Sequence, residues 1–94
     1  MTKEHILTFL KNKKEFLSQN FGVRSIGLFG SYARNEATQK SDIDLVVDMP
    51  SSFENFFDLK YYLEENFKVK VDLIKEKNLR AFIKNRIQNE LLYA

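Results

Sequence analysis

Two aspartates, Asp42 and Asp44, stand two residues apart in a segment where apolar and polar residues alternate. In a strand, residues with this spacing point to the same face, with Cα atoms roughly 6.6 Å apart. Carboxylates so placed repel each other unless a cation lies between them. The chain has no cysteine and one histidine, and a site of oxygen ligands alone favours Mg²⁺ or Mn²⁺ over zinc. The pair therefore predicts a divalent-cation site, of the kind that two-metal chemistry requires.

A glycine and a serine, Gly30-Ser31, provide a matching site for phosphate. They follow a short apolar segment and precede a brief helical signal over 31–36, so they occupy a strand-to-helix turn. Glycine lets a ligand approach the backbone, and the free N–H groups that begin a helix bind phosphate oxygens. The Ser31 hydroxyl adds another donor. Metal-binding carboxylates beside such a turn suit the chemistry of nucleoside triphosphates.

Each of these features alone has an ordinary structural explanation. An Asp-x-Asp at the start of a strand is most often a solvated turn, and Gly-Ser after a strand is most often a plain helix start. The single histidine, His5, lies near the start of an amphipathic helix and is best interpreted as a surface residue. A catalytic triad is therefore disfavoured, and a zinc site lacks the additional His or Cys that it needs. Only the combination, in the right elements, indicates a site.

Three strands must position these residues. Short β-branched or alternating segments predict strands over 23–29, 42–48 and 68–74. With the helices between them, the element order is αβαβαβα. This order implies a three-stranded sheet with helices packed on it, in the α/β (α+β) class.

Alternation along the second and third strands separates an apolar face from a face that bears aspartates. The apolar face of the second strand has three residues: Ile43, Leu45 and Val47. Its other face has four: Asp42, Asp44, Val46 and Asp48. In the third strand, Asp72 points away from Val71 and Leu73, so it too lies off the apolar face.

The helices are predicted from apolar residues at three- and four-residue spacings. The first begins after a cap at Thr2 and ends at Gly22, and Ser51 with Glu54 has the pattern of a capping box for the next long helix. That helix carries aromatic residues that we expect in the core: Phe53, Phe56, Phe57 and Phe67. The final helix has five apolar positions: Leu79, Phe82, Ile83, Ile87 and Leu91.

Length and composition indicate one domain over residues 1–94, in which 44% of residues are hydrophobic. The absence of cysteine, a polar N-terminus and the lack of a membrane-length apolar run favour a cytoplasmic protein. The net charge of +2 divides into +4 over 1–35, −6 over 36–65 and +4 over 66–94. This pattern differs from the basic stripe of a nucleic-acid groove, so we expect neither nucleic acid nor membrane as a direct partner.

The sequence resembles the signature of the nucleotidyltransferase superfamily that includes DNA polymerase beta. In that signature a Gly-Ser pair is followed, after ten residues, by Asp-x-Asp; here these are Gly30-Ser31 and Asp42-Ile43-Asp44. Residues 28–34 with 41–47 are more closely similar to the minimal nucleotidyltransferase (MNT) family, and Leu92-Tyr93 fits it too. Two positions depart from the family pattern. Asn35 replaces a usual Gly, and Asn tolerates a left-handed backbone. Gln39 replaces a frequent Pro.

The resemblance implies a nucleotidyltransferase fold, a small mixed sheet flanked by helices, with ATP as substrate. It implies that Asp42, Asp44 and Asp72 bind Mg²⁺, with two metals expected and Mn²⁺ as another option, and that Asp72 can serve as general base. Gly30 and Ser31 would hold the β- and γ-phosphates. Arg34 either reaches the triphosphate or pairs with a nearby acidic residue.

The same resemblance implies an antitoxin of a HEPN/MNT pair. Such a protein adenylyltransferase moves AMP from ATP to a tyrosine of its partner, a HEPN RNase toxin, and releases pyrophosphate. Ninety-four residues leave no room for an acceptor domain, so we expect the acceptor on another chain and a hetero-oligomer. Two alternatives stay open: an antitoxin that acts by occlusion without catalysis, and the nucleotidyltransferase subunit of an aminoglycoside-type enzyme for small molecules.

Overall fold

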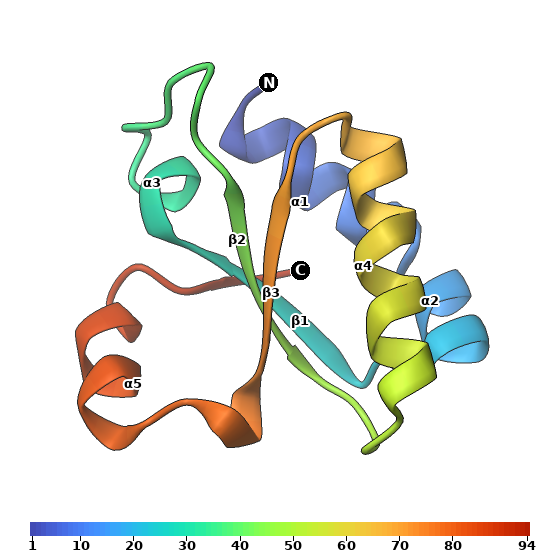
Figure 1. Ribbon diagram of the computed structural model, residues 1–94. Coiled ribbons are helices and arrows are strands. Elements are labelled where there is room, and N and C mark those ends of the chain that lie inside the picture. The colour runs from blue at the N-terminus through green and yellow to red at the C-terminus, as the bar shows by residue number, and fades with distance from the viewer.

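The computed structural model describes residues 1–81 and 83–94 and contains a twisted mixed sheet with helices on both sides (Figure 1). The strands are β1 (Ser25–Phe29), β2 (Ile43–Asp48), β3 (Val71–Lys75) and β4 (Leu92–Tyr93). The helices are α1 (Lys3–Asn12), α2 (Lys14–Phe21), α3 (Gly30–Ala33), α4 (Phe53–Phe67), a 3-10 turn (Glu76–Asn78) and α5 (Ala81–Ile87). None of the described helices is long and apolar enough to cross a membrane.

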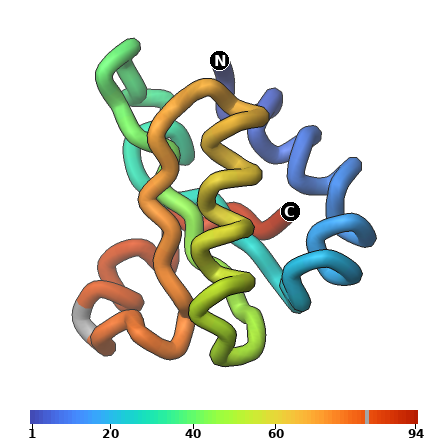
Figure 2. The backbone as a smooth tube through the Cα atoms, turned by 45° about the vertical axis from the view of Figure 1, so that its right-hand side comes forward, coloured from blue at the N-terminus to red at the C-terminus, as the bar shows by residue number. Residues whose placement is uncertain are grey.

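The strands form one sheet in the order β3-β2-β1-β4. Strand β1 runs antiparallel to both β2 and β4, whereas β2 and β3 are parallel. The predicted mixed sheet flanked by helices is therefore confirmed. The predicted number of strands is wrong, because the chain returns after α5 and adds β4 beside β1, as the tube in Figure 2 shows.

The core lies between one face of the sheet and helices α1, α2 and α4, of which α2 and α4 lie to the right of the strands in Figure 1. Ile43, Leu45 and Val47 point into it and are almost fully buried, as their alternation predicts. The other face carries Asp44 and Asp72 on adjacent strands. The sequence pattern therefore assigned the two faces of β2 correctly.

Val46 departs from that simple picture. Alternation places it on the same face as Asp44, yet its side chain is only 1% exposed. The reason is that α5 and the segment after it cover this part of the second face, where Val46 lines a pocket with Ile87, Leu91 and Tyr93. The acidic face is thus open at one end of β2 and covered toward the other.

The N-terminal helical segment is two helices where the sequence predicted one. Helix α1 ends at Asn12, and Lys13 has a non-helical backbone before α2 begins. No apolar residue stands between Leu10 and Phe16, so core packing does not hold the helix regular across this stretch. The two predicted ends are confirmed: the Thr2 hydroxyl accepts a hydrogen bond from the His5 amide, and Gly22 caps α2 in the left-handed conformation.

The start of α4 also differs from prediction. Its cap is Ser52, whose hydroxyl accepts a hydrogen bond from the Asn55 amide at 3.2 Å, so the capping box of Ser51 with Glu54 is wrong. Phe67 is buried, but Phe53 at the first helical position is 78% exposed, so its assignment to the core is wrong.

The C-terminal helix is shorter than predicted. It ends at Ile87, and Leu91 does not continue its apolar stripe. Instead, the side chains of Leu91 and Tyr93 lie over Gly27, where a Cβ atom would meet Leu91 Cδ1 at 2.9 Å. Because Gly27 has no side chain, the segment that contains β4 can pack beside β1. Phe82, predicted on the same helix, lies outside the described residues.

Core packing makes a direct stability prediction for α4. Replacing the fully buried Leu59 by alanine is expected to lower the free energy of unfolding by about 2–5 kcal/mol, because it leaves a cavity. The same truncation at exposed Phe53 is expected to cost less than about 1 kcal/mol. Urea unfolding of both variants measures the difference. Equal losses would show that the buried side of α4 has been assigned wrongly.

Candidate active site

Two of the three predicted carboxylates lie side by side at one end of the sheet, and the third stands two residues before one of them in the chain. Asp44 of β2 is the register partner of Asp72 of β3, so the two lie side by side on adjacent strands. Neighbouring strands are roughly 4.8 Å apart, and partners in register point to the same face. Asp42 lies just before β2, close enough for its charge to act on Asp44. Parallel pairing thus brings together residues that are about thirty positions apart in the chain.

Gly30 packs directly against this cluster. A Cβ atom at Gly30 would lie 2.9 Å from Asp44 Cγ and closer still to its Oδ2 atom. The backbone at Gly30 also has φ +78°, a conformation that L side chains rarely adopt. Both conditions require glycine here. The Gly-Ser turn and the first carboxylate strand are therefore adjacent in space, and Ser31 is the next residue of the same turn.

The carboxyl group of Asp44 is held in an unfavourable environment. The pKa of Asp44 is raised from 3.8 to about 6, chiefly by burial and then by the negative charges of Asp72, Asp42 and Glu90, whereas the charge of Arg34 lowers it. A carboxylate with this environment gains from a bound cation. The electrostatics thus agree with the predicted use of this face.

The raised pKa of Asp44 predicts how stability depends on pH. Between about pH 4 and pH 6 the folded chain binds the Asp44 proton and the unfolded chain does not, so stability falls as the pH rises through this window. The shift corresponds to about 3 kcal/mol for a fully buried group. For the partly exposed Asp44 we expect roughly 1 kcal/mol, because water screens the charge.

This effect is measurable by comparing Asp44→Asn with the unmodified chain in metal-free buffer with a chelator. The variant is expected to be equally stable near pH 4 and more stable by roughly 1 kcal/mol at pH 7. Denaturant unfolding at several pH values gives this difference. A stability difference between the two proteins that stays constant with pH, or that shrinks as the pH rises, would contradict a raised pKa of Asp44.

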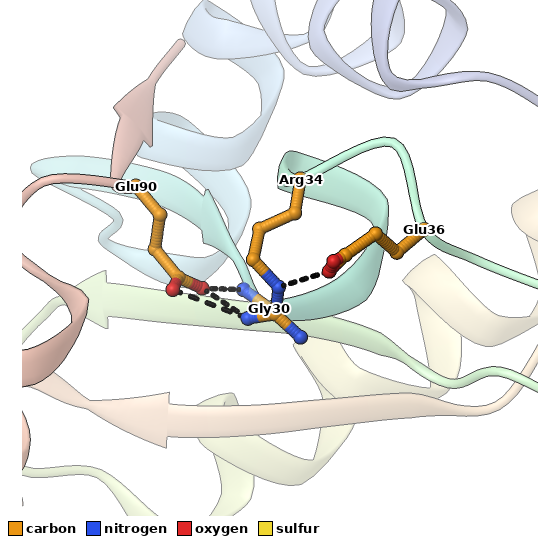
Figure 3. A network of polar contacts seen from close by, with 4 residues as sticks. All are labelled: Gly30, Arg34, Glu36 and Glu90. Atoms are coloured by element: carbon orange, nitrogen blue, oxygen red, sulfur yellow. Dashed lines mark hydrogen bonds and ion pairs between the residues drawn. The ribbon is translucent and has the colours of Figure 1, made fainter.

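Arg34 and Glu90 form the second part of the site, shown in Figure 3. The Gly30 amide donates a hydrogen bond to Glu90 Oε2 at 2.5 Å, and Arg34 Nη1 lies 3.1 and 3.0 Å from the two oxygens of that carboxylate. Arg34 Nε donates to Glu36 at 3.0 Å. These acidic partners raise the pKa of the Arg34 guanidinium. Arg34 therefore lies at the predicted phosphate turn and is paired with acidic residues in this structure.

The donor set fits a hard divalent cation. Its candidates are carboxylate oxygens on one sheet face, which suit Mg²⁺ or Mn²⁺. In the part of the chain that the structure describes, no three acidic or histidine side chains already converge into a finished metal centre. What supports cation binding is the pairing of Asp44 with Asp72 and the mutual repulsion that raises the pKa of Asp44.

Comparison with known proteins agrees with this geometry. The family profile described as "Nucleotidyltransferase domain" matches residues 10–94, which include the Gly-Ser turn and all three carboxylates. The chain belongs to the nucleotidyltransferase family. The resemblance noted in the sequence is thereby confirmed.

A curated relative of this nucleotidyltransferase is protein adenylyltransferase MntA of Thermococcus cleftensis, 39% identical over 95 residues, which cover 99% of this chain and 96% of the relative. A solved structure provisionally described as a minimal nucleotidyltransferase is 26% identical, with a TM-score of 0.81 and coverage of 98% and 95%. A toxin–antitoxin structure with AMP-PNP is 22% identical, with a TM-score of 0.70, and covers 88% of this chain and 70% of its own. The last comparison supports the fold alone.

Glu90 is the residue of this nucleotidyltransferase site that sequence reasoning missed. The apolar spacing predicts a helix that continues through Leu91, but Glu90 lies in the turn between α5 and β4. Its contacts with Gly30 and Arg34 join residues that are 60 and 56 positions apart. No local spacing could have revealed them. The left-handed turn predicted at Asn35 is confirmed by its φ of 60°.

Proposed function

We propose that this nucleotidyltransferase is an Mg²⁺-dependent protein adenylyltransferase. It moves AMP from ATP to a tyrosine hydroxyl of a partner HEPN RNase toxin, releases pyrophosphate, and thereby acts as an antitoxin. The observation that carries the proposal is the register pairing of Asp44 with Asp72 beside the Gly30 turn. That arrangement supports the proposal because the proposed metal ligands and the proposed phosphate-binding backbone are adjacent.

The proposed reaction forms one bond and breaks one. The tyrosine oxygen attacks the α-phosphorus of ATP, and the bond from that phosphorus to the bridging oxygen of the β-phosphate breaks. Pyrophosphate leaves, and Asp72 accepts the proton of the tyrosine hydroxyl. Asp42, Asp44 and Asp72 would hold Mg²⁺, which when bound neutralises phosphate charge and favours ionisation of the attacking hydroxyl.

The remaining residues of the site would hold the phosphate chain. Gly30 offers a backbone N–H, Ser31 a hydroxyl, and Arg34 a planar guanidinium that matches two phosphate oxygens at once. All three lie on or next to α3, at the end of β1. The triphosphate would therefore extend from the carboxylates toward Arg34, with its α-phosphorus nearest the aspartates.

The relatives support a protein acceptor. The Thermococcus cleftensis relative carries the name protein adenylyltransferase. A fold neighbour with a TM-score of 0.64 is described as a tri-AMPylated Shewanella oneidensis HEPN toxin in complex with an MNT antitoxin. By analogy, the acceptor of this chain would be a tyrosine on a HEPN partner, and the working assembly a hetero-oligomer.

The test uses ATP labelled at the α-phosphate, Mg²⁺, the purified chain, and the HEPN protein encoded beside it. The expected result is label on a tyrosine of the partner and release of unlabelled pyrophosphate. Label on an added aminoglycoside and none on protein would favour a small-molecule enzyme. Neutralisation of the toxin without any label would favour occlusion. Either of these two results would contradict the proposal.

A further inference from the structure

Glu90 occupies the place where the proposed phosphate chain would bind. Its carboxylate accepts the Gly30 N–H at 2.5 Å and receives Arg34 Nη1 at 3.0 and 3.1 Å, as Figure 3 shows. The Glu90 side chain is only 19% exposed, so it is set into the site and does not lie loosely on the surface. Gly30 and Arg34 thus have an anionic partner supplied by the chain itself.

Carboxylate and phosphate oxygens accept hydrogen bonds from the same donors in the same geometry. The single N–H of Gly30 cannot donate fully to both, and Glu90 fills the position beside it. The negative charge of Glu90 also acts on Asp44, which places two carboxylates near each other at the end of the sheet. A phosphate group that binds here must therefore displace Glu90 or be repelled by it.

The position of Glu90 in the fold makes such an exchange feasible without unfolding. It lies in the turn 88–90, whose backbone is closed by the Glu90 amide donating to the Ile87 carbonyl at 3.0 Å. The segment after the turn is anchored separately, because the Ala94 amide donates to the Ile26 carbonyl and Tyr93 packs over Gly27. Rotation of the Glu90 side chain alone can release Gly30 and Arg34.

We infer that Glu90 is an internal competitor of the triphosphate. In the free chain it holds the Gly30 amide and Arg34, and on nucleotide binding its carboxylate is exchanged for phosphate oxygens. This inference rests on the proposed function, since it concerns the same nucleotide site. Its consequence is that Glu90 sets the affinity for ATP and leaves the transfer step itself largely unchanged.

Glu36 offers a matched control. It also accepts a hydrogen bond from Arg34, at 3.0 Å from Nε, but its side chain is 57% exposed, and Glu90 takes the Gly30 amide. Removing either charge frees one side of the guanidinium. Only removal of the Glu90 charge also takes an anionic acceptor away from the Gly30 amide. A general effect of unpairing Arg34 would therefore appear in both variants, and competition for phosphate only in one.

The experiment measures binding of AMP-PNP with Mg²⁺ by calorimetry, and the KM for ATP and kcat of transfer, in Glu90→Gln, Glu90→Ala and Glu36→Gln. Both Glu90 variants are expected to bind about tenfold more tightly, with KM lowered in proportion and kcat within about threefold. Glu36→Gln is expected to change binding by less than about twofold. In the unmodified chain, AMP-PNP is expected to move the ¹³Cδ resonance of Glu90 to the value of a solvent-exposed glutamate.

The outcomes separate this inference from the proposed function. If the unmodified chain transfers AMP but the Glu90 variants bind AMP-PNP equally or more weakly and the Glu90 resonance does not move, the competition is wrong and the function stands. If neither the unmodified chain nor the variants bind the nucleotide, both are wrong. Should the Glu90 variants fail to fold, the resonance of the unmodified chain decides alone.

Discussion

Replacing Asp44 by asparagine is expected to reduce AMP transfer on the order of 10³-fold or more. Asparagine keeps the size of the side chain but removes the charge that would bind Mg²⁺ between Asp44 and its register partner Asp72. Metal-free stability is expected to rise at neutral pH, because the raised pKa of Asp44 shows that its charge opposes folding. Loss of activity with a gain of stability would mark a functional and not a structural residue.

Asp48→Asn is the matched control for this prediction. Asp48 lies on the same strand and the same face as Asp44, but its carboxylate pairs with Arg24 at 3.0 Å, away from Gly30. We expect it to leave transfer within about threefold of the unmodified chain, since surface ion pairs contribute little. Transfer assays with labelled ATP measure both variants. Equal losses of transfer in the two variants would show that the reaction depends on the negative charge of β2 as a whole and not on Asp44 in particular.

Gly30→Ala is expected to reduce transfer by at least about 100-fold. The new methyl group would lie 2.9 Å from Asp44 Cγ, and a backbone at φ +78° cannot relieve the clash cheaply. Either the Asp44 carboxylate or the turn must move, and a displacement of about 1 Å at a reacting site can cost 100-fold. The variant is therefore expected to lose transfer even where it remains folded.

Gly22→Ala separates strain from function. Gly22 has a nearly identical φ of +74°, but its nearest neighbours are Pro50 atoms far from the carboxylates. Each alanine is expected to lower the free energy of unfolding by about 1–2 kcal/mol through the left-handed backbone. Only Gly30→Ala should lose transfer when both are assayed well below their melting temperatures. Loss of activity in both would trace the effect to stability.

The predictions for Asp42, Asp44 and Asp72 rest on sequence signals that are local. Asp42 and Asp44 share one face by their spacing, and alternation alone moves Asp72 off the apolar face. The register between β2 and β3 was not contained in those signals. Parallel strands are joined by long connections, and here α4 connects β2 to β3 and shares one core with both. Only the resemblance to a known family predicted that Asp72 acts together with Asp42 and Asp44.

The errors lie where local signals are short or conflict with tertiary contacts. Leu92–Tyr93 is too short a strand for any periodicity, and its place depends on the absent side chain of Gly27, sixty-five residues earlier. Leu91 fits the apolar spacing of α5 only by coincidence. The helix ends at Ile87, and the Leu91 side chain packs on the sheet over Gly27. The cap of α4 is Ser52 and not the equally suitable Ser51, and Phe53, at the first helical position, is exposed.

The charge pattern of the chain now has a structural meaning. The acidic middle segment includes Asp42 and Asp44, and the basic C-terminal part contributes Asp72 to the same cluster. Arg34 and Glu90 are 56 positions apart in the chain and meet beside it. Although the net charge of the chain is close to zero, the fold gathers an acidic site that a divalent cation would partly neutralise. The Arg34 guanidinium, which suits phosphate, lies next to that site.

The most direct test of the central claim is mass spectrometry of the HEPN partner after incubation with this chain, ATP and Mg²⁺. We expect adenylyl groups on a tyrosine of the partner, loss of its RNase activity, and neither effect with the Asp42→Ala/Asp44→Ala double variant. An unmodified partner whose RNase activity is nevertheless blocked equally by the unmodified chain and by the double variant would contradict it.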